Sequence, residues 1–104
     1  MYTLVGQRIL WVDIEEKQFE VRASTVSGAL REALLRSLER EKAGELVEGG
    51  KASYRFALNA DTAKGNKLIL TVCGEGKKWS EAIEEAYIRV CGWQGKAPEL
   101  PVKA

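Results

Sequence analysis

The chain has 104 residues, a length that fits one domain, and 45% of them are hydrophobic while 30% are charged, as in water-soluble globular proteins. It contains no histidine and only two cysteines, Cys73 and Cys91. This composition excludes a disulfide framework, an ordinary zinc site and every catalytic pair that needs an imidazole. We therefore expect no metal, no cofactor and no enzymatic activity.

The first predicted elements are two strands, over residues 8–14 and 19–24. The first segment is rich in β-branched and aromatic residues, and in the second Phe19 and Val21 alternate with charged residues. The polar residues 15–18 between them favour a turn. Together they predict a hairpin.

An amphipathic helix is predicted next, over residues 26–42. Its apolar residues, Leu34 among them, recur at three- and four-residue spacing, which predicts one buried stripe. Thr25 or Ser27 can accept a hydrogen bond from the first free N–H groups. Gly44 is placed to end the helix.

The second half of the chain repeats this order. Alternating apolar residues predict strands over 52–58 and 67–73, joined by a loop over 59–66 that is rich in turn residues. A second amphipathic helix follows over 79–91. Residues 93–104, which include two prolines, predict an extended tail.

Residues 8–44 and 52–92 thus share one plan, a hairpin followed by a helix. The helix starts at Val26 and Trp79 align at an offset of 53, with five of eleven positions identical. An internal duplication explains this match, and so does the common pattern of any two amphipathic helices. The predicted fold is a single α+β domain over residues 1–104. It is a two-layer sandwich of ββαββα order, with a four-stranded, mainly antiparallel sheet carrying both helices on one face.

The turn before the second helix carries the strongest chemical signal. Gly74 and Gly76 precede Lys77 and Lys78 at a helix start, where backbone N–H groups and the helix dipole favour an anion. Residues 74–86 also resemble the last turn and helix of double-stranded RNA-binding domains, but those domains have a third strand where residues 51–73 supply two. The sequence therefore assigns no family. The predicted anion-binding or nucleic-acid-binding face consists of Lys51, Arg55, Lys67, Lys77 and Lys78.

The other candidate sites are apolar side chains that the helix and strand patterns do not bury. They are Ile9, Trp11, Leu35, Ile69, Ile88 and Trp93. Such residues favour homodimerisation or contact with another protein. Our leading hypothesis is a small, cytoplasmic, non-enzymatic binding or accessory protein that acts through protein–protein contact, of the size common among phage and mobile-element products. The alternative is a nucleic-acid-binding module that uses the basic second hairpin.

Overall fold

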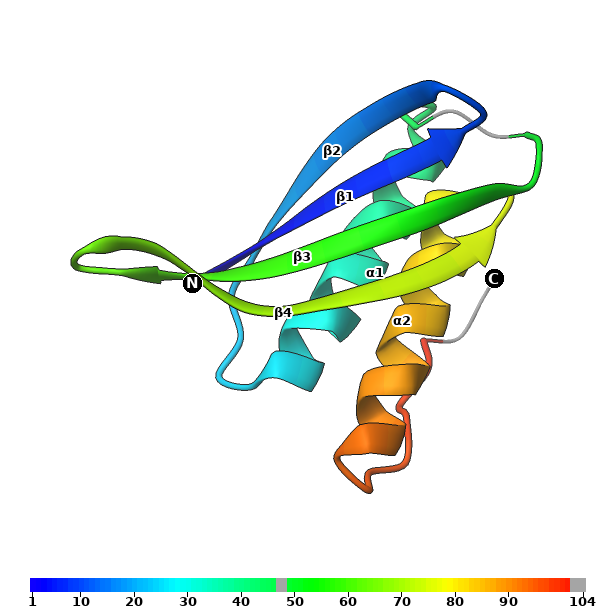
Figure 1. Ribbon diagram of the computed structural model, residues 1–104. Helices are drawn as coiled ribbons and strands as arrows, with labels where there is room; N and C mark the ends of the chain where they lie inside the picture. The colour runs from blue at the N-terminus through cyan, green and yellow to red at the C-terminus, as the bar shows by residue number, and fades with distance from the viewer. Residues whose placement is uncertain (47–48, 102–104) are drawn as a thin grey trace.

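The computed structural model describes residues 1–46 and 49–101 and consists of one sheet covered by two helices (Figure 1). Its elements are β1 (Tyr2–Leu10), β2 (Asp13–Val21), α1 (Val26–Lys42), β3 (Ala52–Thr62), β4 (Gly65–Gly76) and α2 (Trp79–Trp93). The strands lie in the order β2-β1-β3-β4, and every neighbouring pair is antiparallel. Both helices lie on the same face of the sheet (Figure 1). The predicted fold class is confirmed.

The first hairpin turns at Trp11 and Val12, so the predicted strand over 8–14 and the predicted turn over 15–18 are wrong. Leu4 and Phe19 are both buried and lie opposite each other in neighbouring strands. In an antiparallel hairpin with Leu4 opposite Phe19, the turn lies halfway between these two residues in the sequence. A register shift of one residue would move the buried apolar side chains to the solvent face, so their burial fixes this register. The polar residues 15–18 therefore belong to β2.

The second hairpin is longer than predicted. Most of the predicted loop over 59–66 is strand, and the turn is reduced to Ala63 and Lys64. Beyond Tyr2, the start of β1, strands β3 and β4 continue as a two-stranded arm that projects past the helices (Figure 1). The register shifts between Leu58 and Asn59, leaving Ile69 as an extra residue in β4. This β-bulge breaks the alternation on which the strand prediction depended.

The core lies between the sheet and the helices, and Trp79 is at its centre. Its ring contacts Tyr54 at 5.0 Å and Phe19 at 6.0 Å between centroids. Gly6 makes room for it, since a Cβ there would lie 2.6 Å from Trp79 Cζ3. The sequence pattern predicts eight core residues, and all are buried except Leu70, which is partly buried: Phe19, Val21, Leu30, Leu34, Phe56, Leu70, Ile83 and Tyr87.

Local signals fix the helix ends. The Thr25 hydroxyl accepts a hydrogen bond from Gly28 N at 3.0 Å, which caps α1 as predicted. Gly44 follows the end of α1 with a φ of 78°, a conformation that favours glycine. After α2, the chain is held near Glu99, whose carbonyl accepts from Arg31 and whose N–H donates to the Tyr87 hydroxyl. The last three residues of the predicted tail lie outside the described residues.

The two hairpin–helix halves occupy equivalent places in the sheet. β1 and β3 are the central strands, each hairpin places its second strand at an edge, and each helix packs against its own hairpin. The hairpin turns are separated by 52 residues and the helix starts by 53, and Ile69 in the bulge accounts for the difference. The internal duplication stays a hypothesis. Within the described residues, neither helix has the length and apolar character needed to span a membrane.

Candidate functional site

The start of α2 was the predicted anion site, and carboxylates of the chain itself fill it. Glu81 Oε1 accepts hydrogen bonds from the backbone N–H groups of Lys77 and Lys78, at 3.1 and 3.0 Å. Glu41, near the end of α1, accepts from both Ser80 N and Ser80 Oγ at 2.7 Å. The donors that would bind a phosphate therefore already bind carboxylates, and the helix dipole is complemented by negative charge.

The five predicted basic residues do not form one face. Lys51 lies beside the α2 start and pairs with Glu75 at 3.6 Å. Arg55 projects from β3 on the side of the sheet that faces away from the helices, which we call the open face. Lys67 lies nine residues from Gly76 along β4, about 30 Å away in an extended strand. Lys51, Lys77 and Lys78 are brought together, while Arg55 and Lys67 are not.

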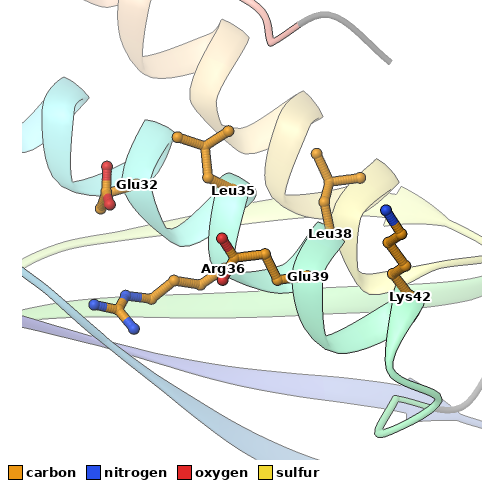
Figure 2. Close-up of a pocket in the computed structure, with 6 residues that line it drawn as sticks. All are labelled: Glu32, Leu35, Arg36, Leu38, Glu39 and Lys42. Atoms are coloured by element: carbon orange, nitrogen blue, oxygen red, sulfur yellow. The ribbon is translucent and has the colours of Figure 1, made fainter. Parts of the chain in front are cut away.

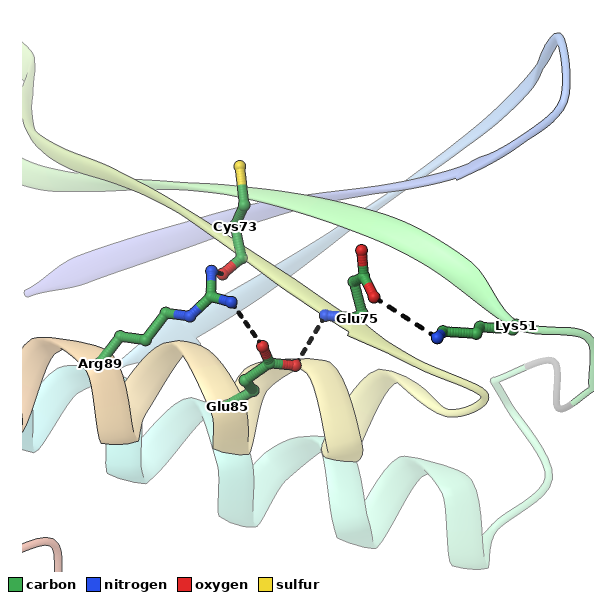
Figure 3. A network of polar contacts seen from close by, with 5 residues as sticks. All are labelled: Lys51, Cys73, Glu75, Glu85 and Arg89. Carbon is green, nitrogen blue, oxygen red and sulfur yellow. Dashed lines mark hydrogen bonds and ion pairs between the residues drawn. The ribbon is translucent and has the colours of Figure 1, made fainter.

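The outer edge of β4 is closed by α2 (Figure 3). Glu85 Oε2 accepts from Glu75 N at 2.9 Å, and Arg89 Nη1 donates to the Cys73 carbonyl at 2.8 Å. Glu85 and Arg89 also pair with each other at 2.6 Å. This pair satisfies two backbone groups at a sheet edge that would otherwise template pairing with another chain.

α1 protects the opposite edge in a similar way. Arg40 Nη1 donates to the Gln18 carbonyl on β2 at 3.0 Å, and its guanidinium lies 5.0 Å from the centroid of the Phe19 ring. The neighbouring Arg36 and Leu35 line a groove on α1 together with Leu38, and Figure 2 shows the two leucines pointing to the same side. Carboxylates and cations alternate along this groove instead of converging on one point, so it offers no acid–base pair.

The predicted contact residues fall on separate surfaces. Ile9 is on the open face, Trp11 is in the first turn, and Ile69 is in the bulge of β4. Leu35 lies in the α1 groove. Ile88 and Trp93, which are 42% and 66% exposed, lie on α2. Ile9 and Trp11 lie at the same end of the first hairpin.

Ile9 and Trp11 join two residues that sequence reasoning missed. Trp11 is 92% exposed and Val12 is 94% exposed, and directly behind the turn Ile9 pairs with Ile14, which is 62% exposed. We call Ile9, Trp11, Val12 and Ile14 the first-hairpin tip. Val12 and Ile14 were assigned to a strand interior because the turn was placed at residues 15–18. A two-residue turn made of tryptophan and valine carries none of the usual glycine or asparagine signals.

Trp11 also has an unusual backbone. Its φ is 57°, and it is the one residue other than glycine with a positive φ in the part of the chain that the structure describes. This left-handed conformation costs a residue with a Cβ about 1–2 kcal/mol relative to glycine. The strained backbone of Trp11 thus carries a large aromatic side chain that is exposed to solvent and gains no stabilising packing within the chain.

A buried polar pair lies beneath the same hairpin. Arg8 Nε donates to the Tyr54 hydroxyl at 3.1 Å, and Arg8 Nη2 also donates to the Gly49 carbonyl. Burial raises the pKa of Tyr54 above its ordinary value, against the lowering influence of Arg8. This contact ties β1 and β3 to the segment after α1, and it faces the core rather than a cavity.

No protein family matches the chain, and neither a curated protein nor a solved structure matches it.

Proposed function

We propose that the chain is a small non-enzymatic binding protein that acts through protein–protein contact, with the first-hairpin tip as its contact site. The observation that carries this proposal is Trp11, a strained and almost fully exposed tryptophan at a hairpin turn. Tryptophan is the residue most often found at the energetic centre of protein interfaces. Val12 and the Ile9–Ile14 pair extend the apolar surface behind it.

The charges around the tip indicate the kind of partner. Asp13 and Glu16 are exposed beside it, Arg8 next to Ile9 is buried, and Lys17 on β2 pairs with Glu15 at 3.5 Å. An apolar prominence with an acidic border fits an apolar pocket with a basic border. The same acidic border opposes an anionic membrane surface or a nucleic-acid backbone.

Site-specific photo-crosslinking in the native host tests the proposal. A photoreactive phenylalanine analogue replaces Trp11, and a matched control carries it at Lys64, the exposed turn of the second hairpin. We expect a discrete adduct with one protein from position 11 and none from position 64. Equal or absent labelling at the two positions would remove the tip from the function.

The nucleic-acid alternative has less support, because Glu41 and Glu81 occupy the α2 start and the five basic residues are dispersed. It makes an opposite prediction. Saturable submicromolar binding to duplex RNA or DNA at about 0.15 M salt, lost in the Lys77→Ala/Lys78→Ala double variant, would favour it over the tip.

A further inference from the structure

The open face is a second surface. It adjoins the first-hairpin tip at the Ile9–Ile14 pair and has a charge pattern of its own. Its central positions are uncharged, with Val5 on β1 opposite Ala57 on β3. One row further along, Glu16 on β2, Gln7 on β1 and Arg55 on β3 lie side by side. The acid is on an edge strand and the cation is on a central strand of the same row.

These two charges are unequally satisfied within the chain. Glu16 Oε2 accepts one hydrogen bond, from Gln7 Nε2 at 3.2 Å. The side chain of Arg55 makes neither a hydrogen bond nor an ion pair with any of residues 1–46 and 49–101. Glu75, diagonal to Arg55 on β4, is the nearest carboxylate on this face, and it pairs with Lys51 at 3.6 Å instead. The Arg55 guanidinium is therefore a docking point for a carboxylate from outside the chain.

We propose that a second copy of the chain packs on the open face, with the two sheets face to face around a two-fold axis parallel to the strands. That axis places β1 over the partner's β3 and β2 over the partner's β4. It also keeps residues that lie side by side across the sheet at the same height along the strands as their copies in the partner. Glu16 then lies one strand away from Arg55 of the partner subunit. The symmetry repeats the pair, so the interface holds two such ion pairs around the small residues Val5 and Ala57.

The charges select this axis over its alternative. A two-fold axis running across the strands would place Glu16 opposite Glu16 of the partner subunit and Arg55 opposite Arg55 of the partner subunit. Like charges at that distance oppose association. Sheets packed face to face lie about 10 Å apart, a gap that one glutamate and one arginine side chain can span between them.

The area of the open face sets the expected strength. Four strands at about 4.8 Å spacing and nine residues at about 3.3 Å each cover roughly 600 Å² in projection. This is at or below the roughly 800 Å² per partner of a standard interface. We therefore expect a micromolar dimer. The strand-parallel axis also places both first-hairpin turns at the same end of the dimer, where Trp11 and Val12 lie beyond the paired strands.

Charge exchange tests the proposal. Glu16→Arg alone and Arg55→Glu alone each place like charges at both contacts, so each should weaken association at least tenfold in sedimentation velocity between about 1 and 500 μM protein. Mixing the two variants restores opposite charges at both contacts, so the mixture should associate again as a heterodimer. Glu39→Arg on α1, in the other layer, is the matched control and should dimerise like the wild type.

The thiols supply a second measurement. Cys73 is exposed in the same row as Arg55, whereas Cys91 is buried. The reaction of Cys73 with a thiol reagent should slow as the protein concentration passes through the dimer range. A wild type that stays monomeric at 500 μM, or two variants that do not restore each other, would overturn the proposal. Trp11→Asn should leave dimerisation unchanged. This control distinguishes dimerisation through the open face from binding of another protein through the first-hairpin tip.

Discussion

Glu41 and Ser80 join the end of α1 to the start of α2 through two hydrogen bonds of 2.7 Å, from the backbone N–H and the hydroxyl of Ser80. The residues are 39 positions apart and come from different halves of the chain. One carboxylate thus caps the second helix, fixes the helices antiparallel to each other and occupies the best anion-binding position in the molecule.

Replacing Glu41 should therefore change both stability and anion binding. Glu41→Ala removes the cap, so the free energy of unfolding in urea should fall by about 1–2 kcal/mol. It also frees Ser80 N, so inorganic phosphate should raise the melting temperature of the variant more than that of the wild type. Glu39→Ala, an exposed change on the same helix, is the control and should do neither. Equal stabilisation of wild type and variant by phosphate would contradict this account of the α2 start.

Gly6 should not tolerate a side chain. A Cβ would lie 2.6 Å from Trp79 Cζ3 and 2.9 Å from a Phe56 ring carbon, so Gly6→Ala forces the aromatic core to move. We expect a loss of about 1–3 kcal/mol in urea unfolding. Gly92→Ala, in α2 with no atom within 4 Å of the new Cβ, should instead stabilise the chain by up to about 1 kcal/mol. Similar effects at both glycines would mean that Trp79 does not pack over β1.

Alkaline pH should weaken the fold through Tyr54. Burial raises the pKa of Tyr54 in the folded state, so its neutral form is favoured there, while the unfolded chain ionises near the ordinary value of about 10. The stability that depends on the neutral hydroxyl is complete below about pH 10 and is lost as pH rises through the folded-state pKa. Urea unfolding between about pH 8 and 11 should show this fall.

Tyr54→Phe should flatten that fall without abolishing it, because burial also raises the pKa of Tyr87. At about pH 8 the variant should be less stable than the wild type by about 1 kcal/mol, since Arg8 loses its acceptor. A variant with an unchanged slope would show that Tyr54 ionises equally well in the folded and unfolded chain.

Periodicity was sufficient for the layers, and local capping was sufficient for the ends of α1. The second helix runs two residues further than predicted, so Trp93 belongs to α2 and not to the tail. The α1 bounds of Val26 and Lys42 match the prediction, because Thr25 caps the start and the apolar stripe needs no distant partner. The prediction of the first turn failed because the register of the hairpin depends on which of its residues the helices bury. That information comes from Leu4 and Phe19 in the folded chain, and not from the polar residues 15–18.

The candidate sites were harder to predict than the fold. Lys77 and Lys78 form an anion-binding signal in sequence, but Glu41, 36 residues before Lys77, occupies the donors beside them. A contact between the two halves of the chain has no local signature. Trp11 was identified as a contact candidate because the strand pattern left it unburied. The positive φ that marks it as strained follows from the turn and could not be predicted without it.

The strain at Trp11 predicts a variant that is more stable and less able to bind. Asparagine tolerates the left-handed conformation better than tryptophan does, so Trp11→Asn should raise the free energy of unfolding by about 0.5–1 kcal/mol. Val12→Asn, at the neighbouring turn position without a positive φ, is the matched control and should leave stability within about 0.5 kcal/mol of the wild type. Urea unfolding measures both. The Trp11→Asn variant should also fail to co-purify with the partner identified by crosslinking from position 11. The substitution removes the aromatic ring that we propose enters the partner's apolar pocket. A less stable Trp11→Asn variant would show that the ring stabilises the hairpin, and the case for a residue held exposed for binding would fail.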